Sequence, residues 1–169
     1  MKELLLQFSA YHLWANQLLL DGISQLPEEK QNQEIVSSFP TLYKTVLHIW
    51  DAESIWWQRL KLQERINIPS ETFKGTMKEL GNNLLQQNKQ WNEWIENAQT
   101  HMLEHVFQYQ NSKREQFKQP IYQMLLHLFN HNTYHRGQLV NLMRQAGVEK
   151  LPATDFILWS RKKISSLAH

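Results

Sequence analysis

The chain has 169 residues, of which 41% are hydrophobic and 20% are charged, and its formal net charge at pH 7 is +2. This length and composition are typical of one globular domain, here residues 1–169, and the chain is too short for two ordinary domains. The small net charge excludes the electrostatic pattern of an obligate nucleic-acid-binding protein. The lack of any apolar run of about 18 residues excludes a membrane-spanning helix.

Cysteine is absent from the chain. Its absence excludes disulfides, thiolate metal sites and a cysteine nucleophile. A metal ion would therefore have to be held by imidazole and carboxylate groups, which suit zinc, nickel, copper or iron better than magnesium or calcium. The N-terminal segment has polar residues every few positions and lacks the apolar run of a signal peptide, so a cytoplasmic location is expected.

The first predicted helix covers residues 2–20, where apolar side chains recur at helical spacing. We expect Gly22 and then Pro27 to end it. His12 lies on its apolar side and is interpreted as a partly buried histidine with a structural or pocket-lining role. The polar run that follows, residues 28–38, predicts a loop.

A second helix is predicted from Thr41, a suitable N-cap, to about Leu62. His48 stands one residue away from the apolar row of this helix and can face inward at its edge. Residues 63–75 predict a connection. A third helix is predicted over residues 77–99, with a neutral, solvated outer face rich in glutamine and asparagine.

Residues 101–120 break the helical pattern and predict two short extended pieces around a turn, as in a small hairpin or an irregular excursion. His101 and His105 are four residues apart here, but this weakly helical context favours exposed polar side chains over a shared metal ion. Pro120 suits the first turn of a fourth helix. Gly147 stands where that helix should stop.

A fifth helix is predicted to begin near residues 153–155, where Thr154 or Asp155 can cap it, and to end in the basic run 161–163. The pattern contains no repeat or linker that would indicate a second domain. The predicted fold class is all-α: a bundle of four main helices, with an additional C-terminal helix and a short irregular or hairpin insertion before the fourth helix.

Three histidines, His127, His131 and His135, lie at four-residue spacing in the fourth predicted helix. This spacing places them on one stripe, with neighbours about 6 Å apart along the axis. Two neighbouring imidazoles can share one metal ion, but the outer pair is about 12 Å apart, so a third ligand must come from another helix. The inward-facing His48 is the candidate. The His-x-x-x-His spacing lacks the intervening glutamate of zinc peptidases, so it is a moderate signal of a metal site. The alternative is that the histidines lie on a solvated helix face or belong to a polar network in the core.

Four segments resemble sequences of the DinB family of DinB/YfiT-like metalloenzymes, and the resemblance extends over nearly the full chain. The segments are residues 11–16, 47–53, 130–138 and 152–156, and the third contains the most specific motif, His-x-x-x-His-Arg-Gly-Gln. The resemblance implies a four-helix bundle with up-down-down-up order and a left-handed twist. It also implies one divalent metal ion, usually zinc or nickel, held by His48, His131 and His135. Members of the family are often homodimers.

Related branches of the family carry a carboxylate at the position of His131 and include thiol-cofactor-dependent isomerases and S-transferases, and some members are bacillithiol transferases. The resemblance therefore implies a metal-dependent enzyme. Our first hypothesis is an S-transferase that uses a low-molecular-weight thiol, such as bacillithiol, on electrophilic small molecules. Catalysis would depend on a metal-bound water or thiol activated at His48, His131 and His135. Because the chain has no cysteine, the thiol would be a soluble cosubstrate.

Two alternative functions stay open. One is a non-enzymatic stress protein that binds a metal or a ligand and dimerises through its apolar faces. The other is a metal-dependent hydrolase. In each case the expected partner is a small molecule, with no nucleic acid and no membrane, and a homodimer is a further expectation.

Four polar residues near the expected ligands are candidates for orienting the imidazoles: Asp51, Glu53, Asn130 and Tyr134. Asp51, one turn beyond His48, is also a candidate fourth ligand. Solvated positions or ordinary core hydrogen bonds are the favoured interpretation of all four. His127 is interpreted as lining the pocket or supporting the ligands. Arg136 is interpreted as an anchor to another helix, and Gly137 as a site of close helix packing.

Overall fold

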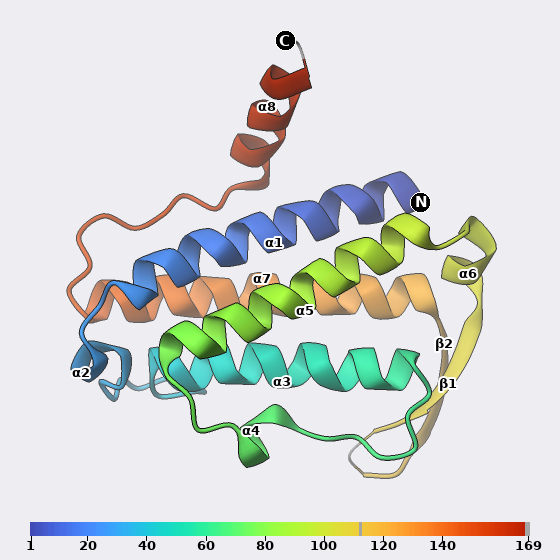
Figure 1. Ribbon diagram of the computed structural model, residues 1–169, viewed down its shortest axis with the longest axis horizontal. Helices are drawn as coiled ribbons and strands as arrows, with labels where there is room; N and C mark the ends of the chain where they lie inside the picture. The colour runs from blue at the N-terminus through green and yellow to red at the C-terminus, as the bar shows by residue number, and fades with distance from the viewer. Residues whose placement is uncertain (112, 168–169) are drawn as a thin grey trace.

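The structure, a computed structural model, describes residues 1–111 and 113–167, with side chains up to Arg161 (Figure 1). Most of these residues lie in helices, and two short strands form a hairpin. In chain order the elements are α1 (Lys2–Ser24), α2 (Glu28–Gln31), α3 (Leu42–Leu60), α4 (Pro69–Thr72), α5 (Met77–Asn97), α6 (Thr100–Glu104), β1 (Val106–Gln110), β2 (Gln116–Pro120), α7 (Ile121–Gln145) and α8 (Phe156–Leu167).

The four long helices α1, α3, α5 and α7 form the bundle. Both α1 and α3 pack against α5 and α7. In Figure 1, α1 and α7 run in one direction while α3 and α5 run in the other, which is the up-down-down-up order. The predicted helical bundle and its helix order are therefore confirmed, and the left-handed twist stays a prediction.

Local sequence signals set several helix ends. Thr41 caps α3, since its side chain accepts a hydrogen bond from the backbone one turn later. Thr76 and Glu79 form a reciprocal capping box at the start of α5. Gly147, which follows the end of α7, has a φ angle of +92° that glycine adopts without steric cost. The predicted cap at Thr41 and the predicted stop near Gly147 are confirmed.

The interior of the bundle has three levels. One buried apolar cluster lies at the end where α1 and α7 finish, and it includes Leu19, Leu80 and Leu142. The other lies at the opposite end and includes Trp91 and Leu125. Between the two clusters all four long helices contribute buried polar side chains: His12, Asn16, Glu53, Asn88, Asn132 and Arg136. The bundle therefore has a polar layer between two apolar ones.

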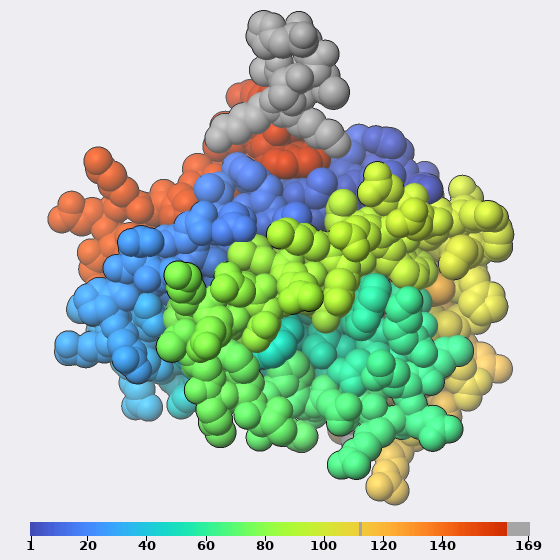
Figure 2. Space-filling view, viewed as in Figure 1, coloured from blue at the N-terminus to red at the C-terminus, as the bar shows by residue number. Residues whose placement is uncertain are grey.

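The excursion before α7 is an antiparallel hairpin in which Val106 pairs with Pro120 and Gln110 with Gln116, so the predicted hairpin is confirmed. The C-terminal helix α8 stands away from the bundle in Figure 1 and contacts α1. Its Phe156 ring packs on Phe8, with 5.4 Å between the ring centroids. On the face shown in Figure 2, the side chains of α1, α5 and α3 lie against one another. None of the described helices is long and apolar enough to cross a membrane.

Several predicted boundaries were wrong. Residues 28–38, predicted as a loop, contain the four-residue helix α2, and the connection 63–75 contains α4, which starts at Pro69. A proline at the first helical position costs no hydrogen bond, so a single turn forms there. Pro120 is the last residue of β2 and precedes α7. The last helix does not end in the basic run 161–163 but continues to Leu167.

Two glycines have roles different from those predicted. Gly22 was expected to end the first helix, but α1 continues to Ser24. A Cβ atom at Gly22 would lie 3.1 Å from Cε of Met143, so this glycine permits close packing of α1 on α7. Gly137 was expected to permit close packing, but it is exposed and no atom lies within 4 Å of an ideal Cβ. Helical spacing could not predict which glycine permits close packing, because it does not show which residue of another helix packs against each glycine.

Candidate metal centre

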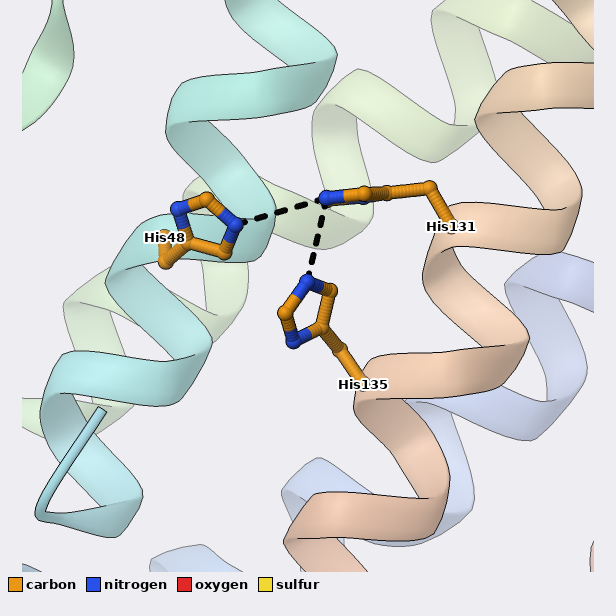
Figure 3. Close-up of side chains that lie close together, drawn as sticks. All are labelled: His48, His131 and His135. Carbon is orange, nitrogen blue, oxygen red and sulfur yellow. Dashed lines mark hydrogen bonds between the residues drawn. The ribbon is translucent and has the colours of Figure 1, made fainter. Parts of the chain in front are cut away.

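Three imidazole rings converge between α3 and α7 (Figure 3). His48 comes from α3, and His131 and His135 come from consecutive turns of α7. Nε2 of His131 lies 3.3 Å from Nε2 of His48 and 3.0 Å from Nε2 of His135. One ring nitrogen from each of the three histidines lies within 4.8 Å of the other two, so the group could hold a metal ion.

Hydrogen bonding sets the tautomer of His135. Its Nδ1 lies 2.7 Å from Oε1 of Gln138, one turn further along α7. An amide oxygen only accepts, so Nδ1 carries the proton and the lone pair of Nε2 faces the other histidines. Gln138 belongs to the specific motif, but sequence reasoning assigned it no role. Its distance of three residues from His135 on a helix was the available signal.

Burial keeps the three imidazoles neutral. It lowers the pKa of His48 to about 4, with a further contribution from the nearby His135. Burial also lowers the pKa of His131 to about 4, and the neighbouring histidines add to the effect. The pKa of His135 is lowered by burial as well, against the opposing effect of the hydrogen bond that it donates to Gln138. Neutral imidazole is the form that binds a metal ion, so the cluster is ready for one at neutral pH.

The donor set fits a late first-row divalent ion. Around tetrahedral zinc, with Zn–N distances of about 2.0–2.1 Å, neighbouring nitrogens stand about 3.3 Å apart. The two shorter separations in the cluster, 3.0 and 3.3 Å, are close to this value. Three nitrogen ligands and an open fourth position are typical of catalytic sites rather than closed structural ones. Within the described chain, Nδ1 of His131 is buried without a hydrogen-bond partner, so this ligand is less firmly oriented than His135.

Aromatic rings surround the cluster. Phe39 stacks on His48 with 3.9 Å between ring centroids, and its ring also meets the edge of His135 at 5.8 Å. Tyr134 meets His135 edge to face at 5.1 Å. His127 lies beside the group, with its ring centroid 5.9 Å from that of His131, so it lines the site as predicted. Sequence reasoning missed Phe39, because it precedes α3 in a segment without helical period.

The four polar residues near the ligands mostly follow the interpretation favoured from the sequence. Asp51 accepts a hydrogen bond from the backbone N–H of Ser70 and lies outside the cluster, so it makes an ordinary hydrogen bond and is not a fourth ligand. Burial raises the pKa of Asp51, and the hydrogen bonds from Ser70 oppose this effect. Asn130 is exposed, and Tyr134 contacts His135 through its ring. His101 and His105 are exposed and outside the cluster, as predicted.

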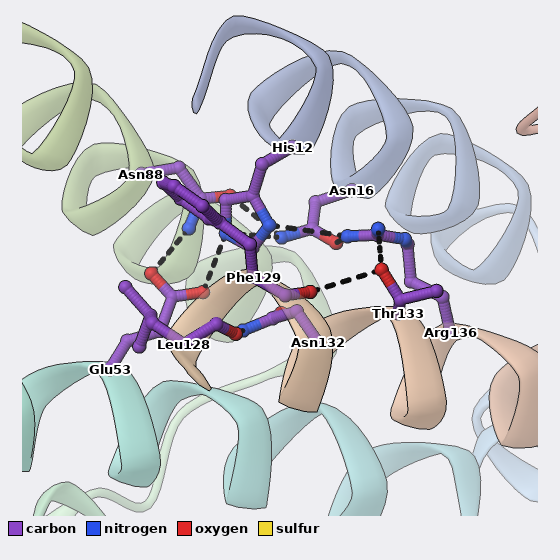
Figure 4. Close-up of polar contacts among 9 residues, drawn as sticks. All are labelled: His12, Asn16, Glu53, Asn88, Leu128, Phe129, Asn132, Thr133 and Arg136. Atoms are coloured by element: carbon purple, nitrogen blue, oxygen red, sulfur yellow. Dashed lines mark hydrogen bonds and ion pairs between the residues drawn. The ribbon is translucent and has the colours of Figure 1, made fainter. Parts of the chain in front are cut away.

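Glu53 belongs to a separate buried network in the polar layer (Figure 4). Its Oε1 lies 2.9 Å from Nε2 of His12, and its Oε2 accepts a hydrogen bond of 2.6 Å from Asn88. On the other side of the imidazole, Nη1 of Arg136 donates to Nδ1 of His12 at 3.2 Å. Because a guanidinium only donates, Nε2 of His12 carries the proton and donates to Glu53.

This network joins all four long helices through buried groups. His12 and Asn16 come from α1, Glu53 from α3, Asn88 from α5 and Arg136 from α7. Burial lowers the pKa of His12, against the opposing carboxylate of Glu53, so a neutral imidazole separates the two charged groups. Arg136 therefore anchors α7 to another helix, as predicted. His12 is 1% exposed, which is more complete burial than predicted.

The fold and the cluster define a class: a four-helix-bundle protein in which three histidines from two helices could hold a divalent metal ion. Residues 1–163 match the DinB family, and the chain belongs to this family. It is 27% identical over 168 residues to protein DinB of Bacillus subtilis strain 168, a match that covers 94% of this chain and 95% of that protein.

A solved structure supports the fold. The crystal structure of a DinB-like protein from Bacillus cereus ATCC 10987 superposes with a TM-score of 0.63 and 22% sequence identity. The match covers 82% of this chain and 89% of that chain. At this level of identity the likeness shows a shared fold, and the chemistry of the site has to be argued from the residues themselves.

Proposed function

We propose that the protein is a divalent-metal-dependent S-transferase that joins a low-molecular-weight thiol, such as bacillithiol, to an electrophilic small molecule. The observation that carries this proposal is the convergence of three neutral imidazoles in a chain without cysteine. Membership of the DinB family supports it, since the resemblance described above implies thiol-dependent transferases in related branches. The absence of a protein thiol means that the nucleophile must be a soluble cosubstrate.

Each residue around the site has a defined task in this proposal. His48, His131 and His135 hold the ion, for which zinc and nickel suit the nitrogen ligands best. When bound, such an ion supplies positive charge and an open coordination position, which lower the pKa of a thiol or water. Gln138 keeps the Nε2 lone pair of His135 free to act as a ligand. Phe39 covers the face of His48 and excludes water from that side.

The test is elemental analysis of the purified, untagged protein beside His48→Ala and His135→Ala. Thiol-transfer assays then follow on metal-loaded samples, with bacillithiol as the thiol and monochlorobimane or fosfomycin as the electrophile. We expect about one metal ion per chain in the wild type and its loss in both variants. The matched control is His101→Ala, because His101 is an exposed histidine outside the cluster.

The outcomes separate the alternatives. A wild-type protein that neither retains nor binds zinc, nickel, iron or copper would overturn both the metal site and the enzyme. Metal binding without transfer to any electrophile would favour a non-enzymatic metal- or ligand-binding protein. Turnover of esters or amides without thiol, lost in His135→Ala, would assign a hydrolase.

A further inference from the structure

A second polar site lies at the far end of α3. There a cavity of about 390 Å³ opens between the C-terminal end of α3, the loop after it and the β1–β2 hairpin. Its lining includes Arg59, Glu64, Tyr109 and four glutamines, one from the loop and three from the hairpin. The cavity has the size of a small-molecule subsite, and its amide groups can both donate and accept hydrogen bonds.

Arg59 is held in place on the wall of this cavity, but its charge is not paired. Its guanidinium carbon lies 4.6 Å from the ring centroid of Trp56 and 5.3 Å from that of Tyr109. Its Nε is buried without a hydrogen-bond partner. Within the described residues, no carboxylate lies at ion-pair distance from it. An arginine that is fixed by aromatic rings, lines a cavity and has no carboxylate partner is suited to binding an oxyanion through its guanidinium group.

A continuous set of rings connects Arg59 with the histidine cluster. The Trp56 ring, beneath the guanidinium, lies 5.5 Å from the His127 ring. The His127 ring lies 5.9 Å from that of His131, one of the candidate ligands. Along α3, Arg59 stands eleven residues beyond His48, which corresponds to about 16 Å. An extended small molecule could therefore lie over these rings with one end at the cluster and the other at Arg59.

We propose that Arg59 is the oxyanion anchor of an extended ligand site that runs from the histidine cluster over His127 and Trp56 to the hairpin cavity. The ligand is an elongated small molecule that carries a carboxylate or phosphate group about 16 Å from its reacting end. The identity of the reacting end rests on the proposed transferase function. Oxyanion binding at Arg59 does not, because it requires no metal ion.

Calorimetric titration of the full-length, metal-free protein tests this proposal, with succinate and inorganic phosphate as separate probes. The variants are Arg59→Met, Arg59→Lys and the control Lys61→Met. Lys61 is the matched control because it lies at the end of the same helix and also stacks on a tryptophan, with Nζ 4.9 Å from the Trp57 ring, but it does not line the cavity. Circular dichroism and thermal unfolding establish that each variant is folded.

We expect Arg59→Met to weaken binding of the preferred anion by roughly tenfold or more, since a charge-assisted hydrogen-bond pair is lost. Arg59→Lys should lie between this variant and the wild type, because it keeps the charge without the planar fork. Lys61→Met should bind like the wild type. Tighter binding of succinate assigns a carboxylate ligand, and tighter binding of phosphate assigns a phosphorylated one. A wild type that binds neither anion, or equal affinity in Arg59→Met and Lys61→Met, overturns the proposal.

A kinetic measurement separates failure of this site from failure of the transferase. The probe is 12-mercaptododecanoate, a thiol long enough for its carboxylate to lie about 16 Å from its sulfur, and the control is the uncharged 12-mercaptododecan-1-ol of the same length. Arg59→Met should raise KM for 12-mercaptododecanoate roughly tenfold, with a smaller change in kcat, and leave KM for the alcohol unaffected. If the wild type binds anions but transfers no thiol, the anchor stands and the transferase fails. If the wild type transfers both thiols and Arg59→Met changes neither KM, the anchor fails and the transferase stands.

Discussion

The histidine cluster and the buried Glu53 network both join α3 to α7, but their ring nitrogens have different neighbours. In the cluster, Nε2 of His131 lies 3.3 Å from Nε2 of His48 and 3.0 Å from Nε2 of His135. In the network, each ring nitrogen of His12 has a hydrogen-bond partner within the protein. Nδ1 accepts from the guanidinium of Arg136, and Nε2 donates to the carboxylate of Glu53.

This difference separates a binding histidine from a structural one. The nitrogens of the cluster are not satisfied by a carboxylate, so an ion is the partner that would satisfy all three together. His12, by contrast, is satisfied within the protein and is 1% exposed, so it has neither the space nor the free lone pair for a ligand. Removing one member should therefore affect folding in the network and metal binding in the cluster.

The largest expected effect is on the network. Glu53→Ala should lower the free energy of unfolding by about 3–5 kcal/mol, because it leaves buried His12 and Asn88 without their carboxylate partner and removes the negative charge that favours the charged form of buried Arg136. Denaturant unfolding measures the change. Glu93→Ala is the control, since Glu93 is an exposed carboxylate on α5. A loss below about 1 kcal/mol would mean that the network is not a structural unit.

The next effect is on metal binding. His48→Ala should weaken zinc affinity by more than about 100-fold, because even the loss of a supporting hydrogen bond costs a metal site 10–100-fold. A competition titration with a chromophoric chelator measures the affinity. The unfolding free energy of the metal-free variant should match or exceed that of the wild type, since a desolvated imidazole is removed. If His48→Ala instead lost much stability and kept its zinc affinity, the histidine cluster would be a structural unit like the Glu53 network, and the comparison would fail.

A smaller effect is expected where a hydrogen bond orients a ligand. Gln138→Ala should lower zinc affinity about tenfold, because His135 loses the acceptor that fixes its tautomer. The same chelator competition measures it, and Gln145→Ala, an exposed position on α7, is the control. Equal affinities in both variants would show that packing alone orients His135.

A further expected effect is a pH dependence of the metal-free protein. The pKa values of His48 and His131 are about 4 in the folded state, below the ordinary histidine value of about 6.5. Between these values the unfolded chain binds more protons, so the contribution of the two residues to stability falls as pH is lowered from about 6.5 to 4 and is constant above about 7. Urea midpoints measured from pH 7.5 to 4.5 should fall less steeply in His48→Gln. Parallel curves for the wild type and His48→Gln would contradict the assignment of this pH dependence to the lowered pKa of His48.

The four long helices could be predicted from the sequence because their signals are local. These signals are the helical spacing of apolar side chains, the cap at Thr41 and the stop at Gly147. Each depends only on neighbours along the chain, and the structure confirmed all three. The pairing of His131 with His135 is equally local, since any helix places residues four apart on one face. His48 could be proposed because it faces inward on another helix.

The supporting residues could not be predicted from the same signals. Asp51 and Glu53 are close to His48 in sequence, but one binds the backbone of Ser70 and the other binds His12. Phe39 covers His48 from a segment with no regular period. Each of these contacts depends on how α3 is rotated against its neighbours, which spacing along one helix does not contain.

Sequence by itself determined where the four long helices lie, where the hairpin interrupts them and which histidines share a helix face, because these properties arise from contacts within a few residues. Tertiary packing alone decided that the rings of His48, His131 and His135 converge while His12 is satisfied by Glu53 and Arg136. The physical reason is that the axial position of a side chain is a property of its own helix, whereas the partner of a side chain depends on the rotation and contact of two helices.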